Sequence, residues 1–114
     1  MAKKDLVSIN DEEFNDRIIL NKTDALVKFS PHWNAAGHIL SNLLNGLSKQ
    51  YNSKIRFYSL DIKPDSSLCS TYRIGGTPTI LFFKKGKLVD RLSGLVQKEI
   101  ISEKLDQLIN VTTH

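Results

Sequence analysis

A strand, a long helix and a second strand follow one another near the start of this chain and constrain its fold more than any other feature. Ala25–Phe29 is apolar on both faces except at Lys28, as expected of a central strand covered by helices. Asn34–Tyr51 carries a broad apolar stripe at helical spacing, and Ile55–Leu60 is typical of a second strand. Open sheets place their sites at the carboxyl ends of strands, so we expect the site in Ser30–Gly37.

The other segments add helices and a hairpin to this unit. The pattern predicts helices over Asp11–Leu20, from about Ser66 to Tyr72, and over Glu99–Ile109, and hairpin strands Thr79–Phe83 and Leu88–Leu92 around Lys85-Gly86. Mixed strand directions with helices on both faces follow from this order. The length of 114 residues fits one domain, so we expect a single α/β domain over residues 1–114.

Charge and hydropathy exclude several classes of function. The net charge is +4, and the one tight basic cluster, Lys84, Lys85 and Lys87, is typical of a hairpin tip. Aromatic stacking positions of a nucleic-acid interface do not accompany it. No segment has the apolar length of a signal peptide or of a membrane span. We expect an intracellular, cytoplasmic protein with neither nucleic acid nor membrane as a partner.

One cysteine, Cys69, is present in the whole chain. It forms no intramolecular disulfide and supplies no multi-cysteine zinc site. Between Leu68 and Tyr72 it lies on an apolar helical face, where a cysteine usually acts as a small buried hydrophobe. The alternative is a reactive monothiol, which needs an exposed, electropositive setting.

Two histidines flank the expected site and suggest a metal centre. His32 and His38 are six residues apart across a helix start, so they do not share a helical face, and the sequence places no cysteine or carboxylate beside them. We therefore expect no metal and no cofactor, and two exposed imidazoles that make the rim of the site sensitive to pH.

A set of short motifs in fixed order resembles the thioredoxin family. They are Ala25–Phe29, Trp33 at the start of the long helix, Tyr72–Thr79 (Tyr-Arg-Ile-Gly-Gly-Thr-Pro-Thr), Phe83–Gly86 (Phe-Lys-Lys-Gly), and Gly94. The resemblance covers about residues 6 to 110 without gaps. It implies the thioredoxin fold, with a central mixed five-stranded sheet flanked by four helices.

The resemblance breaks where the family's chemistry takes place. The family's tryptophan is followed by Cys-Gly-Pro-Cys, whereas Trp33 is followed here by Asn34-Ala35-Ala36-Gly37. Disulfide exchange needs one thiolate at the helix N-terminus and a second thiol to resolve the mixed disulfide. Both sulfurs are missing, at Asn34 and Gly37, so we expect no catalytic residues and no dithiol enzyme.

Three further departures accompany the missing cysteines. The resemblance implies a buried aspartate where Lys28 stands, a lysine where Ser59 stands, and a tryptophan where Ser30 stands. Burial disfavours the charged form of a lysine, so Lys28 is either a neutral amine able to act as base or nucleophile, or a side chain whose ammonium reaches water. We favour the second interpretation, because reaching water avoids the desolvation cost.

The parts of the family's site that hold a peptide are retained. Trp33, Thr77, Pro78 and Gly94 match positions that line a shallow groove, and the resemblance implies a cis bond before Pro78. We therefore predict a redox-inactive, thioredoxin-like protein that binds an extended segment of a partner protein there, as an adaptor, assembly or chaperone-like factor. The alternatives are a monothiol protein acting through Cys69 and a scaffold subunit that uses another surface.

Overall fold

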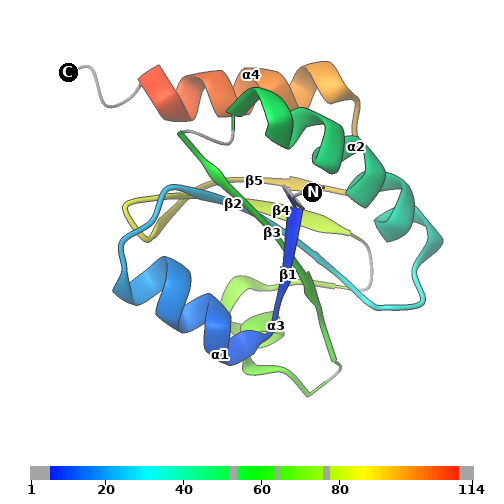
Figure 1. The fold of residues 1–114 in the computed structure, drawn as a ribbon. Helices are drawn as coiled ribbons and strands as arrows, with labels where there is room; N and C mark the ends of the chain where they lie inside the picture. The colour runs from blue at the N-terminus through cyan, green and yellow to red at the C-terminus, as the bar shows by residue number, and fades with distance from the viewer. Residues whose placement is uncertain (1–5, 52–53, 64, 76–77, 111–114) are drawn as a thin grey trace, which may run out of the picture.

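A computed structural model describes residues 6–51, 54–63, 65–75 and 78–110. In this part of the chain the strands form one mixed sheet in the order β1-β3-β2-β4-β5 (Figure 1). β1 and β2 run parallel to β3, and β4 runs antiparallel to both β2 and β5. The strands are β1 (Leu6–Ile9), β2 (Ala25–Ser30), β3 (Arg56–Asp61), β4 (Thr79–Lys84) and β5 (Lys87–Ser93).

Helices cover both faces of this sheet, as the sequence predicts. α2 and α4 lie on one face, and α1, its continuation η1 and α3 lie on the other (Figure 1). The helices are α1 (Asp11–Phe14), η1 (Asn15–Leu20, a π-helix), α2 (Ala35–Tyr51), α3 (Ser67–Tyr72) and α4 (Lys98–Asn110). The expected thioredoxin fold, a five-stranded mixed sheet with four α-helices, is confirmed.

Side-chain alternation along β2 explains the two layers of core. Val27 and Phe29 pack with Phe14 and Phe83 in the layer beneath α1, while Leu26 packs with the helices of the other face. Successive strand residues point to opposite faces, so Lys28 and Ser30 point with Leu26 toward α2. Because of this alternation, Lys28 and Ser30 are the residues that lie under the start of α2.

Two local features differ from the sequence expectation. The pattern does not place β1, because its four residues are too few to show a period. Asp11–Leu20 is helical throughout but changes to π geometry after Phe14. Its start is fixed by a capping box, in which Asn10 Oδ1 accepts the Glu13 N–H at 2.8 Å and Glu13 Oε1 accepts the Asn10 N–H at 3.0 Å.

In the described residues, no helix has the length and apolar character needed to cross a membrane. The cytoplasmic location stays a prediction.

Candidate functional site

The connection from β2 to α2 presents one aromatic side chain to solvent. Trp33 is 78% exposed, directly before the helix starts. Asn34 caps that helix, because its Oδ1 accepts the Gly37 N–H at 2.7 Å. Asn34 is thus the N-cap of α2, and an amide stands where the chemistry of the fold needs a thiolate.

Lys28 lies beneath this connection. The residue is only 4% exposed, and its Nζ donates to Ser41 Oγ at 2.7 Å and to Gly37 O at 3.3 Å. Burial lowers the pKa of the Lys28 amine, and the charge of Asp61 partly opposes this. The expectation that the ammonium reaches water is wrong, because the amine finds hydrogen-bond acceptors on α2 instead of an opening to solvent.

Gly37 is glycine because Ser30 occupies the neighbouring space. A Cβ built on Gly37 would lie 2.6 Å from Ser30 Oγ and 2.9 Å from Ser30 Cβ, which is closer than atoms in real structures approach. Both residues are buried. Strand β2 and the first turn of α2 are therefore in direct contact where the family has its second cysteine.

The two histidines lie together on the rim, and both are exposed. Their ring centroids are 6.1 Å apart, and His38 Nε2 lies 2.9 Å from the His32 carbonyl oxygen. Asp61, from the end of β3, approaches His32 Nδ1 to 3.0 Å. The sequence gives no sign of this carboxylate, because Asp61 is 29 residues from His32 along the chain. Even so, the described residues contain no group of three side chains arranged to hold a metal ion.

A recess of about 280 Å³, called the Trp33 pocket below, lies beside this rim. Its lining joins the β2–α2 connection to the segment after β3 and to α3. The lining residues are Pro31, Trp33, Ile62, Lys63, Cys69, Ile74 and Gly75. It is mostly apolar and large enough for a large side chain. Ile62, Lys63 and Ile74 are additions to the predicted site, and only contact across the fold brings them to Trp33.

Cys69 is not the fully buried side chain that its apolar helical face suggests. It lines this pocket together with Trp33. The thiol is partly exposed, and Sγ lies 3.7 Å from the Lys63 carbonyl oxygen. Burial first, and then the charge of Asp11, raise the pKa of the Cys69 thiol. The setting is the reverse of the electropositive one that activates a cysteine.

The remaining predicted groove residues form a second contact. The Gly94 N–H donates to the Pro78 carbonyl at 2.7 Å, with Gly94 in a left-handed conformation at φ +82°. The described lining of the Trp33 pocket includes neither residue. Thr77, and with it the predicted cis bond to Pro78, lies outside the described residues.

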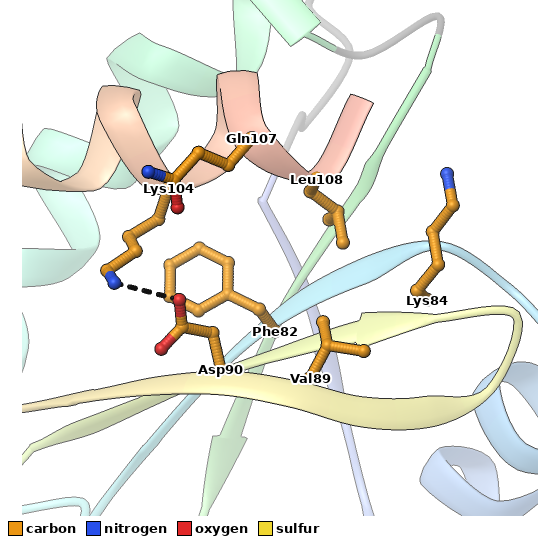
Figure 2. A pocket seen from close by; sticks show the side chains of 7 residues that line it. All are labelled: Phe82, Lys84, Val89, Asp90, Lys104, Gln107 and Leu108. Carbon is orange, nitrogen blue, oxygen red and sulfur yellow. Dashed lines mark ion pairs between the residues drawn. The ribbon is translucent and has the colours of Figure 1, made fainter. Parts of the chain in front are cut away.

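A smaller recess lies on the opposite face, between β5 and α4. It measures about 150 Å³, and Figure 2 shows Lys104 reaching from α4 to Asp90 across Phe82. The Lys104 Nζ lies 2.9 Å from Asp90 Oδ2. Both charged side chains satisfy each other, so this recess offers less to a ligand than the Trp33 pocket.

Comparison with known proteins shows which family has this sequence pattern. The family model described as Thioredoxin matches residues 5–107. The chain is 31% identical over 108 residues to an M-type chloroplastic thioredoxin of Pisum sativum, covering 95% of this chain and 63% of the pea protein. It is 24% identical over 109 residues to the corresponding protein of Spinacia oleracea, covering 96% of this chain and 60% of the spinach protein.

A bacterial relative is matched over almost its whole length. The thioredoxin of Buchnera aphidicola is 29% identical over 105 residues, which cover 92% of this chain and 97% of that protein. The chain thus spans less of the two chloroplastic relatives than of the bacterial one. With the fold, the motifs and these matches in agreement, the chain belongs to the thioredoxin family.

Proposed function

We propose that this chain binds an extended segment of a partner protein at the Trp33 pocket and carries out no dithiol–disulfide exchange. The observation that carries the proposal is the pairing of an exposed tryptophan with an apolar recess at a place where the dithiol is absent. The role is that of an adaptor, an assembly factor or a chaperone-like factor.

The chemistry of the site supports binding and not catalysis. Asn34 Oδ1 is occupied by the helix cap, and the Lys28 amine is held by the start of α2. Neither group is an activated nucleophile. By contrast, a tryptophan beside an apolar recess supplies the kind of anchor that dominates binding energy at interfaces. An extended segment adds main-chain hydrogen bonds to such an anchor.

The proposal has a direct test in two parts. A protein-disulfide reduction assay should give no turnover above background, because no pair of thiols can cycle. Peptides selected from a displayed library against the wild-type chain should bind Trp33→Ala at least about tenfold more weakly, since a hot-spot truncation costs roughly 2 kcal/mol. Lys87→Ala at the hairpin tip is the matched control and should bind normally.

One outcome would assign partner binding to a surface other than the Trp33 pocket. If chemical-shift mapping with a selected peptide perturbed the hairpin tip and left Trp33 unchanged, the scaffold alternative would describe the protein. Turnover in the reduction assay that survived removal of contaminating thioredoxin would remove the redox-inactive part of the proposal.

A second candidate function uses Cys69 as a monothiol, and its position in the Trp33 pocket favours it. Its raised pKa opposes it, because the thiol then stays protonated at neutral pH and the thiolate is the nucleophile. Iodoacetamide should therefore alkylate Cys69 at pH 7 more slowly than it alkylates free cysteine. Faster and selective labelling, followed by intact-mass analysis, would support the monothiol role.

A further inference from the structure

A second and larger hollow adjoins the Trp33 pocket. It measures about 790 Å³ and lies at the carboxyl ends of β1 and β3, between the starts of α1 and α3. Lys63 lines both cavities, so the two lie next to each other on the surface. The charged residues that line it, called the acidic hollow below, are Asp11, Glu12, Glu13, Asp61, Asp65 and Lys63.

The balance of charge in this hollow is opposite to that of the chain. Five carboxylates face one ammonium in a protein whose net charge is +4. Glu13 forms an ion pair with Arg17 at 3.2 Å, and Asp61 approaches His32. Glu12 and Asp65 form no ion pair within the described residues. The surface therefore keeps negative charge that its own neighbours do not neutralise.

This negative charge extends to the apolar pocket. Burial, and after it the charge of Asp11, raises the pKa of the Cys69 thiol, and Cys69 lines the Trp33 pocket. Asp11 itself is held in place, because Ser66 Oγ donates to its Oδ2 at 2.7 Å. A ligand with its apolar part against Trp33 thus lies near the fixed negative charge of Asp11.

We propose that the occupant is an extended, basic peptide segment, with one large apolar side chain in the Trp33 pocket and arginine or lysine side chains over the acidic hollow. This inference rests on the proposed function and adds the chemistry of the partner. Charge complementarity carries it, because opposite potentials steer encounter and discriminate against acidic partners. A bound cation alone fits less well, since the described residues contain no converging set of ligands for a metal ion.

The experiment compares three peptides that differ only in charge. Each is a short extended peptide with a central phenylalanine and no tryptophan, flanked on one side by two arginines, two glutamines or two glutamates. Trp33 is the only tryptophan of the chain, so its emission reports binding at the pocket. The arginine peptide should bind about three- to tenfold more tightly than the glutamine peptide, and the glutamate peptide most weakly. Salt at 0.5 M should reduce these differences.

Matched variants locate the effect in the acidic hollow. Glu12→Gln combined with Asp65→Asn should weaken the arginine peptide about threefold or more and leave the glutamine peptide unchanged, which also shows that the variant is folded. Glu103 is an exposed carboxylate on α4, on the opposite face of the sheet. Glu103→Gln removes the same kind of charge there and should change the affinity for neither the arginine nor the glutamine peptide.

The possible failures are distinct. Equal binding of the three peptides, or equal effects of the two sets of variants, would overturn the charge preference and leave peptide binding standing. If no peptide changed Trp33 emission or gave heat in calorimetry, both the basic-peptide inference and the proposed function would be wrong.

Discussion

The two ends of the sheet are held by different kinds of contact. At the hairpin end, a Cβ on Gly86 would lie 2.9 Å from the Ile18 carbonyl oxygen, which is backbone. At the site end, the corresponding close contact of Gly37 is to the side chain of Ser30. Backbone moves only with the whole fold, whereas a side chain can be exchanged. The site end can therefore change its chemistry without changing the fold, and the hairpin end cannot.

The hairpin end is also tied by polar contacts to the loop before β2. The Gly86 N–H donates to Thr23 O at 3.1 Å, and Asp24 accepts the Lys85 N–H at 2.8 Å. Lys84 Nζ pairs with the same carboxylate at 3.0 Å. Of the three lysines of the tip, Lys84 is thus held in an ion pair, so the basic cluster in the sequence overstates the free charge there.

The largest effect should come from Gly86→Ala. Gly86 has φ +80°, where an L side chain is strained, and its new methyl group would meet backbone on three sides. Strain and overpacking together should lower the unfolding free energy by about 2–4 kcal/mol. Urea denaturation measures the change, with Lys87→Ala as a control that should stay near zero. A loss under about 0.5 kcal/mol would show that the two ends do not differ in this way.

A smaller effect is expected at Gly37. Gly37→Ala should cost about 1–3 kcal/mol, because its methyl group overlaps Ser30. Gly46→Ala in the same helix meets nothing within 4 Å and should stabilise by about 0.5–1 kcal/mol. Combining Gly37→Ala with Ser30→Gly should recover part of the loss, and a double-mutant cycle by thermal denaturation measures that coupling. Strict additivity would contradict the contact.

Restoring the family's cysteines should meet the same obstacle. Asn34→Cys with Gly37→Cys supplies both thiols, but the second one brings a Cβ into the space of Ser30. Reductase activity should stay weak, since Lys28 also stands where the resemblance implies a buried aspartate. Full activity in the insulin-type reduction assay would show that neither Ser30 nor Lys28 hinders the restored thiols.

The smallest effect is expected at Lys28. Lys28→Met should leave the unfolding free energy at pH 7 unchanged or raise it by about 1–2 kcal/mol, because desolvation of the ammonium outweighs its two hydrogen bonds. The lowered pKa means that the unfolded chain holds this proton more tightly, so the wild type should gain stability relative to the variant as pH rises toward the ordinary range of lysine. Urea denaturation between pH 7 and 10 measures the difference. A loss of several kcal/mol of unfolding free energy at pH 7 would show instead that the Lys28 ammonium stabilises the fold.

Local patterns were enough to predict most of the fold. Apolar periodicity and turn residues placed the strands and helices, apart from β1, within one residue of their observed ends. The signal is clear in α2 and α4, which each bury one apolar stripe, and in β2, which is buried throughout. β1 was missed because pairing with β3, and not its own four residues, defines it. The π geometry of η1 has no signal that we can identify in the sequence.

The site was predictable only where neighbours in sequence carry it. Trp33 and the Asn34 cap follow from the start of one helix. Cys69 and Asp61 reach the site from other elements, so sequence spacing gives no measure of their distance from Trp33 or His32. The solvent access expected for Lys28 failed for the same reason, since Ser41 lies 13 residues away and is brought near by helix packing.

The Asp90 carboxylate that pairs with Lys104 also protects the open edge of the sheet. The Gly94 N–H points to β4, so alternation turns the Arg91 N–H outward, where Asp90 Oδ1 accepts it at 2.9 Å. The pairing with β4 is also irregular opposite Phe82 and Phe83, which leaves Val89 as an extra residue in β5. A strand from another molecule would find one donor taken and the edge bent, so β5 resists the edge-to-edge aggregation to which exposed strands are prone.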